Sequence, residues 1–296
     1  MVPGGQAVEV RVVGVMEERK YYSVRTGKNQ GEIKYDLPLL KRGFLNIYKS
    51  FRARYYFQQA YGYNCTDEGY VSGLMGEDIE IFFLTKLRKP DLWPIETKME
   101  GYSEDDLFDV IELLYDFVSK PLEGYEHKWN NCGWHYSTFD KKIGQAEFRA
   151  EINPFLNGYS EGFELSPDGQ ILFQGGPGLK ELLATEIPVH DPKNVDEKVK
   201  YAVLKFRRHR ASVEDKKEAV RTLADVLEFL RPQIKQLPLS KDEGDLFNIA
   251  NNFGIRHHNP DQKTDYDQDI YLEWIFYSYL STIHLAIRLI RSHQRK

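Results

Sequence analysis

The sequence predicts an α+β protein in which a mixed region, residues 1–190, precedes a helical domain, residues 191–296. Two observations predict this division. Before Pro188, β-branched and turn-forming segments alternate with helical patterns, whereas only helical spacings of apolar residues follow it. The 296 residues, 41% of them hydrophobic, are enough for one large domain or two ordinary ones with real cores.

Composition excludes several classes of protein. The mean hydropathy is -0.55 and no apolar run approaches the length of a membrane span, so we expect no transmembrane helix. The first residues lack a basic stretch followed by an apolar one, so no signal peptide is expected. The two cysteines, Cys65 and Cys132, are too few for a disulfide scaffold or a Cys-rich zinc site. These features indicate a cytoplasmic protein.

The N-terminal region combines strand, helix and turn signals. Leu40, Phe44 and Ile47 recur at helical spacing, and Ser103 with Asp106 has the spacing of a capping box. We expect the following order: strands within 1–37, with 21–24 and 31–37 flanking a turn; a helix over 39–61; a Gly/Tyr-rich loop; helices over 77–87 and 107–118; an irregular aromatic segment over 121–140; a helix over 143–156; and a hairpin over 162–173.

The last third contains helical signals only. Asn194 and Ser212 are suitable N-caps, and Pro232 marks the end of a helix. We therefore expect helices over 194–209, 212–230 and 242–253, and a long final helix capped by Asp267 or Asp269. That last helix is apolar on nearly every side, which favours burial at a homodimer interface.

Charge is distributed unevenly between the two regions. The chain has a net charge of -5, but residues 191–296 carry a net +3 and the remainder a net -8. Five of the eight histidines lie in the last third. This asymmetry permits contact with RNA through the helical domain.

One segment between two predicted helices combines the residue types of an RNA-cleaving site. It contains Arg256, His257, His258, Asn259 and Asp261. An arginine fits a phosphate and offsets its charge, and histidine exchanges protons near neutral pH. In metal-free RNA cleavage, one histidine takes the proton of the ribose 2′-OH while a second acid protonates the leaving 5′-oxygen.

Two other interpretations of this segment stay open. Arg256 and the histidines can cap the end of the preceding helix, with Asn259 and Asp261 forming a simple turn. A divalent metal is the third interpretation, although the spacing fits no standard zinc motif. Its ligands would be His257, His258, Asp261, Asp265 and Asp267.

The whole last third resembles the helical HEPN-type module at the C-terminus of bacterial abortive-infection proteins of the AbiJ kind. Three pieces carry the resemblance: residues 216–228, the stretch from Phe247 to His257 with its Gly-Ile-Arg-His, and the aromatic-aliphatic final helix. Upstream, residues 106–112 and the helix at Ile152-Asn153 with the following hairpin resemble the middle region of that group.

The resemblance implies a metal-independent ribonuclease of bacterial antiviral defence, acting as a homodimer on RNA, transfer RNA included, without a cofactor. A partner protein from the same operon is compatible with it. Arg256 and His257 match the Arg and polar positions of the family motif, but Pro260, Asp261 and Gln262 stand where its second histidine is expected. Either His257 and His258 form a variant site, or the module is a non-catalytic dimerisation or sensing relative.

Two further groups of residues are candidates for function. A basic cluster at the end of a predicted helix favours either a solvated helix end or RNA contact, and comprises Lys205, Arg207, Arg208 and Arg210. Cys132 and His135 could pair as nucleophile and base, but no third member can be named. His127 and Trp129 are interpreted as packing residues.

Overall fold

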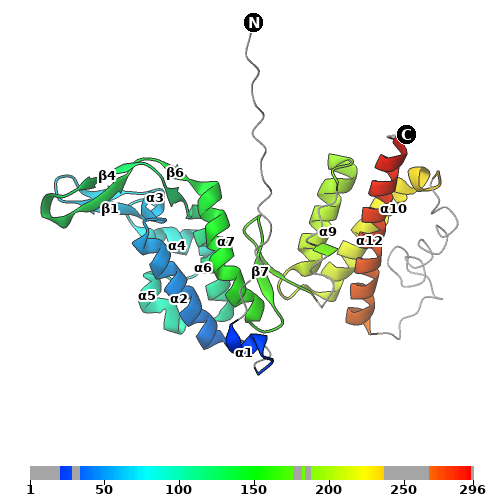
Figure 1. Cartoon of the computed structure of the whole chain (residues 1–296), viewed down its shortest axis with the longest axis horizontal. Helices are drawn as coiled ribbons and strands as arrows, with labels where there is room; N and C mark the ends of the chain where they lie inside the picture. Colours follow the sequence, from blue (N-terminus) through cyan, green and yellow to red (C-terminus); the bar gives the residue numbers. More distant parts are fainter. Residues whose placement is uncertain (1–20, 29–33, 176–181, 184–187, 237–266, 295–296) are drawn as a thin grey trace, which may run out of the picture. The chain divides into compact units, whose positions relative to one another are not determined.

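The structure is a computed structural model, and it describes residues 21–28, 34–175, 182–183, 188–236 and 267–294. It confirms a mixed α+β protein with small antiparallel sheets and a helical C-terminal region (Figure 1). The chain divides into two compact units, residues 1–34 and residues 35–296. Within the described ranges, no helix is both long and apolar enough to cross a bilayer.

The first unit contains the short helix α1 (Tyr22–Arg25). The prediction of a strand at 21–24 is therefore wrong. The four residues form one helical turn, which Thr26 ends by donating its N–H to the carbonyl of Tyr22 at 3.0 Å. The predicted strand at residues 8–16 lies outside the described residues.

Helices form the frame of the second unit. Helix α2 (Leu37–Ala53) begins where the Asp36 carboxylate accepts the N–H of Leu39 at 2.9 Å, which satisfies a free donor of the first turn. The predicted helix over 39–61 is interrupted because Tyr55 adopts a left-handed conformation, with φ of 64°, before α3 (Gln58–Tyr61). The helices that follow are α4 (Ile79–Leu87), α5 (Ile95–Lys98), the 3-10 turn η1 (Met99–Gly101), α6 (Glu104–Phe117) and α7 (Lys141–Gly158).

Two capping boxes confirm the strongest local signals. Ser103 and Asp106 cap α6, and Ser212 and Asp215 cap α10 (Val213–Ile234). In each box the serine side chain accepts the N–H of the aspartate, and the aspartate side chain accepts the N–H of the serine. Helix α10 continues through Pro232 to Ile234. The prediction that Pro232 ends this helix is thus wrong by one turn.

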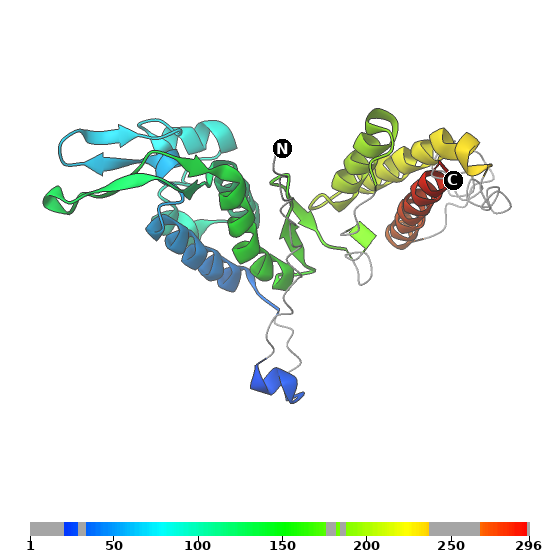
Figure 2. The same cartoon turned by 45° about the horizontal axis from the view of Figure 1, so that its top comes forward.

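In the part of the chain that the structure describes, four antiparallel strand pairs lie among these helices. They are β1 (Gly62–Cys65) with β2 (Gly69–Ser72), β3 (Lys120–Pro121) with β6 (Phe139–Asp140), β4 (Gly124–His127) with β5 (Gly133–Tyr136), and β7 (Phe163–Leu165) with β8 (Ile171–Phe173). The last pair confirms the predicted hairpin. The first three correct the prediction of a loop after residue 61 and of irregular chain over 121–140. Figure 2 shows β1–β2 and β4–β5 running side by side.

The first hydrophobic core is largely aromatic. Phe51 of α2 meets Phe148 of α7 edge to face, with ring centroids 5.3 Å apart, and meets Tyr56 at 4.8 Å. Such pairs add to the free energy gained by burying large rings. This core extends from Leu40 to Ile171 and packs α2, α6 and α7 against the β7–β8 hairpin.

A second core joins the C-terminal helices. The π-helix η3 (Pro192–Asp196) begins at Asp191, not at the predicted cap Asn194, and leads into α9 (Glu197–Arg207). Helices α9, α10 and α12 (Gln268–Gln294) pack together, with Phe206 stacked on Phe276 at 4.0 Å. The two cores fall on either side of the predicted boundary at residue 190, which stays a prediction. The predicted helix over 242–253 lies outside the described residues.

The buried ring of Phe148 provides a test of the first core. We expect Phe148→Ala to lower the free energy of unfolding by about 3–5 kcal/mol, because it removes apolar contacts and leaves a cavity. Denaturant unfolding followed by circular dichroism measures the change. Ile143→Ala, at an exposed position of the same helix, is the matched control and is expected to change it little. Equal losses in the two variants would contradict this packing.

Candidate metal centre

Four metal-ligating side chains converge at the tips of two hairpins. Cys65 ends β1, His127 ends β4, Cys132 precedes β5 and His135 lies in it. One ligand atom from each, sulfur or ring nitrogen, lies within 4.8 Å of every other. Cys65 and His135 are buried, and the other two are half-buried.

The strand register explains why the two histidines share a face. His135 pairs with Tyr125 across the β4–β5 hairpin, and His127 follows Tyr125 by two residues. Because side chains two apart on a strand point to the same side, His127 lies diagonal to His135. Their rings are 5.4 Å apart.

The turn between β4 and β5 brings Cys132 to the same place. Asn130, Asn131 and Gly133 all have positive φ, at 50°, 54° and 98°. Asparagine and glycine tolerate this left-handed backbone better than other residues do. The chain thereby turns sharply, and the Cys132 thiol lies 3.1 Å from Nε2 of His135.

Two sulfur–nitrogen separations in the cluster are close to those of a tetrahedral metal site. Besides the contact of Cys132 with His135, Sγ of Cys65 lies 3.7 Å from Nδ1 of His127. For zinc bonds of ordinary length, sulfur and nitrogen ligands at tetrahedral angles lie about 3.6 Å apart. Small side-chain movements would therefore allow all four to bind one ion.

Each histidine also has an oxygen partner on its outer nitrogen. Nε2 of His127 lies 3.3 Å from the Asp67 carboxylate, and Nδ1 of His135 lies 3.2 Å from the Tyr125 hydroxyl. Metal-binding histidines almost always have such a second partner, because it fixes the ring and the tautomer. In both rings the inner nitrogen is left for the cluster.

The electrostatics of the site favour a thiolate at Cys132. Burial favours the neutral thiol, but hydrogen bonds from the Thr66 backbone and from the side chains of His127, His135 and Thr66 outweigh it. Together they lower the pKa of Cys132 from its ordinary value to about 6. Thiolate is the form that binds metals and attacks electrophiles.

A second group of potential ligands is less suited to a cation. Glu104, Asp105 and His209 lie within reach of one another. However, the Arg210 guanidinium pairs with both carboxylates, at 3.0 and 3.1 Å. This fixed positive charge offsets one of the two carboxylate charges and would repel a metal ion.

The residues predicted as catalytic lie outside the described part of the chain. These are Arg256, His257, His258, Asn259 and Asp261, together with Asp265 of the alternative metal interpretation. Asp267 is described, and it caps α12 by accepting the N–H groups of Asp269 and Ile270. The Arg–His site therefore stays a prediction.

The basic residues predicted to bind RNA are placed by the structure. Arg207 is buried and pairs with Glu164 at 2.7 Å. Lys205 pairs with Glu218, and Arg210 with Glu104 and Asp105. Arg208 is exposed. Three of the four cations thus have carboxylate partners within the chain, and RNA contact by this cluster stays a prediction.

Sequence reasoning found only part of the four-residue cluster. The sequence predicts a possible pairing of Cys132 with His135, and the structure does bring them together, whereas it predicts a packing role for His127. The spacing His127-x4-Cys132-x2-His135 was the available signal for a mixed Cys/His site. Cys65 lies 62 residues before His127, so only the fold shows it as the fourth member.

Comparison of this chain with protein-family models, with curated proteins and with solved structures finds no match.

The lowered pKa of Cys132 predicts its reactivity in metal-free protein. Alkylation by iodoacetamide should rise through a midpoint at about pH 6, because the reactive thiolate forms above the pKa and is lost below it. Mass spectrometry of the labelled peptide measures the rate at Cys132. Added zinc should protect the thiol. A midpoint at about 8.5, the value of a free cysteine, would contradict the arrangement.

Proposed function

We propose that this chain is a zinc-binding protein whose ion joins the tips of the β1–β2 and β4–β5 hairpins. The observation that carries the proposal is the convergence of two thiols and two imidazoles within 4.8 Å. Two Cys and two His are a common ligand set for structural zinc, and cysteine sulfur favours zinc over magnesium or calcium.

The number of ligands favours a structural role over catalysis. Catalytic zinc sites have three protein ligands and an open position for water or substrate. Here four side chains could fill all four positions of a tetrahedron: Cys65, His127, Cys132 and His135. Asp67 and Tyr125 hold the outer nitrogens of the histidines and leave the inner nitrogens for the ion.

The hairpins need such a crosslink because they are small. β1, β2, β4 and β5 have four residues each, and each pair forms a separate two-stranded sheet. An isolated two-stranded hairpin is marginally stable in water. Zinc bound by ligands from both hairpins would contribute its binding free energy to their folded arrangement.

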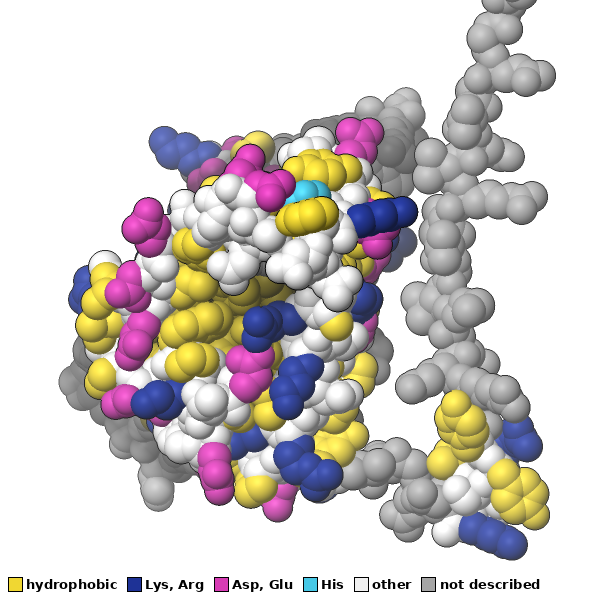
Figure 3. Space-filling view, turned by 90° about the vertical axis from the view of Figure 1, so that its left-hand side faces the viewer, with side chains coloured by type: hydrophobic (Ala, Val, Ile, Leu, Met, Phe, Trp, Pro, Cys, Tyr) yellow, Lys and Arg dark blue, Asp and Glu magenta, His cyan; other side chains and the backbone are white. Residues whose placement is uncertain are grey.

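Exposed aromatic side chains indicate that the zinc-joined hairpins form a binding surface. Trp129 is 69% exposed, Tyr125 59% and Trp134 40%. Trp134 stacks on Tyr136 at 5.5 Å, so part of this surface is held in place. Figure 3 shows the same end of the molecule, where hydrophobic side chains line a hollow bordered by charges of both signs.

For the chain as a whole, we propose an RNA-targeting effector of bacterial antiviral defence. Its support is the Arg256–Asp261 segment and the resemblance of the last third to HEPN-type modules. The exposed tryptophans of the hairpins add a specific observation, because aromatic rings stack on unpaired RNA bases. A non-catalytic dimerisation or sensing module is the alternative.

Zinc binding is tested by metal analysis of the purified protein. We expect one zinc ion per chain, and one cobalt ion after exchange, with the absorption of thiolate–cobalt bonds. Cys132→Ser and His135→Ala should lose the ion, and Asp67→Asn should weaken zinc affinity by about 10–100-fold.

His293→Ala is the matched control, because His293 lies exposed near the end of α12, and it should retain zinc. Wild-type protein that binds neither metal under reducing conditions would contradict the proposal.

Ribonuclease activity is tested with variants of the predicted site. Wild-type protein should cleave total or transfer RNA and leave a 2′,3′-cyclic phosphate. His257→Ala/His258→Ala and Arg256→Ala should lower the rate by about 100-fold or more, the contribution of one general acid or base. Gel analysis and end-group chemistry measure both results, with His293→Ala as the control.

EDTA alone is no test of a metal-free mechanism if zinc stabilises the hairpins. Cleavage without added metal must therefore be compared in protein whose zinc content has been measured. No cleavage of either RNA by the wild type, or unchanged rates in the variants, would contradict the nuclease proposal.

A further inference from the structure

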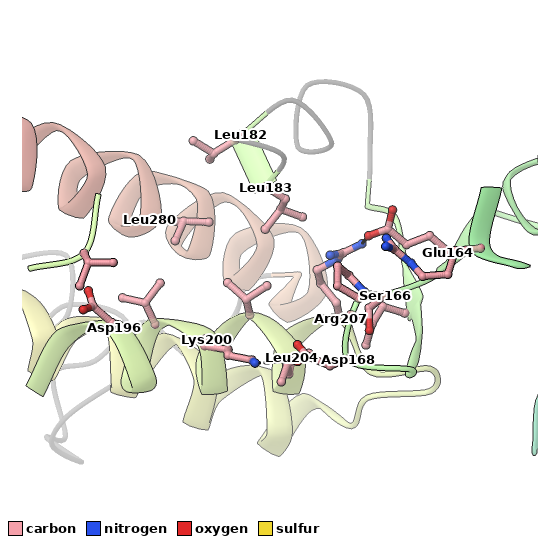
Figure 4. Close-up of a pocket in the computed structure, with 16 residues that line it drawn as sticks. Glu164, Ser166, Asp168, Leu182, Leu183, Asp196, Lys200, Leu204, Arg207 and Leu280 are labelled. Atoms are coloured by element: carbon pink, nitrogen blue, oxygen red, sulfur yellow. Dashed lines mark hydrogen bonds and ion pairs between the residues drawn. The ribbon is translucent and has the colours of Figure 1, made fainter. Parts of the chain in front are cut away.

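The C-terminal helices and the β7–β8 hairpin enclose a cavity that is separate from the metal centre (Figure 4). Its volume is about 570 Å³, within the range of about 300–1,000 Å³ typical of small-molecule sites. Residues of α7, β7, β8, α9 and α12 line it. None of them is part of the zinc cluster.

Most of the cavity wall is apolar. Figure 4 shows Leu204 of α9 on one side, and Leu280 of α12 with Leu182 and Leu183 on the other. Val199 and Val203 continue the wall along α9. Such a lining favours an apolar ligand body, which gains free energy by leaving water.

Two charged pairs in the wall are already neutralised. Arg207 is only 6% exposed, donates Nε–H to the carbonyl of Phe173 at 2.8 Å and pairs with Glu164 at 2.7 Å. Lys200 pairs with Asp168 at 2.8 Å. These four charges therefore contribute little net attraction for a ligand.

The third cation of the cavity wall is Arg149. Its Nε–H donates to the carbonyl of Leu165 at 2.9 Å, which places the guanidinium beside β7. Within the described residues, no carboxylate lies at ion-pair distance from it. The nearby Ser166 is buried, and its hydroxyl oxygen accepts the N–H of Gln170, so the hydroxyl hydrogen can still be donated. This end thus presents donors suited to an anionic head group.

The opposite end carries an acidic group. Figure 4 shows Asp196 across the cavity from Glu164, Ser166 and Arg207. Its carboxylate accepts the N–H of His190 at 3.2 Å, and no cation in the described ranges pairs with it. A second negative charge on a ligand would be repelled there.

From these features we propose that the cavity binds a small monocarboxylate with an apolar tail. The carboxylate lies at Arg149 and Ser166, and the tail lies between Leu183, Leu204 and Leu280. Asp196 selects against dicarboxylates of similar length. This site is independent of the zinc proposal and of the predicted Arg256–Asp261 segment.

Calorimetric titration of the wild-type, full-length protein with three probes tests the proposal. Octanoate should saturate one site. Octan-1-ol, which lacks the charge, and octanedioate, which has a second one, should each bind at least about tenfold more weakly, as expected for loss of a charged hydrogen bond or for repulsion.

Two variants locate the site. Arg149→Gln should weaken octanoate binding by about tenfold or more and leave octan-1-ol binding unchanged, whereas Lys142→Gln on the same helix is the matched control. Leu204→Trp should fill the cavity and abolish binding of octanoate. Circular dichroism checks that each variant is folded.

The wild-type probe series tests the proposal even where a variant fails to fold. No saturable binding of octanoate, equal affinity for octan-1-ol or octanedioate, or retention of octanoate binding by folded Leu204→Trp would each overturn the proposal.

Discussion

Short hairpins cannot bury enough apolar surface to hold themselves in place, and this constraint governs the N-terminal half of the protein. β1–β2 and β4–β5 are separate two-stranded sheets whose outer tips lack a hydrophobic core. At those tips the chain places Cys65, His127, Cys132 and His135 instead of leucine or valine. A metal crosslink is the proposed substitute for the missing apolar contacts.

A different interaction links the two cores. Arg207 at the end of α9 is buried and pairs with Glu164 of β7, while its Nε–H donates to the carbonyl of Phe173. Loss of Glu164 would leave the buried Arg207 charge uncompensated, which costs far more than an exposed pair contributes. The pair also forms part of the wall of the cavity, so one of the contacts between the cores shapes the proposed ligand site.

Local chemistry made much of the fold predictable. Two helix starts are marked by serine caps, Ser103 with Asp106 and Ser212 with Asp215. The β7–β8 hairpin is indicated by its turn residues, Pro167-Asp168-Gly169. The hairpin at 124–136 was missed because polar residues occupy both faces of its strands, so no apolar alternation marks it. The strands of the hairpin at 62–72 have only four residues each, which is too short for alternation to stand out. In the β4–β5 hairpin, a metal crosslink would take the place of the contacts that an apolar face would make.

The charges of the proposed zinc site are consistent with its partial burial. With zinc bound, two thiolates would neutralise its two positive charges and the imidazoles would be neutral ligands, so the core of the site would have no net charge. Without an ion, hydrogen bonds still favour the negatively charged thiolate at Cys132. Asp67 adds a negative charge at the exposed side of His127, where water can screen it. The polar lining of the hairpin tips is therefore better suited to a bound cation than to a metal-free cluster.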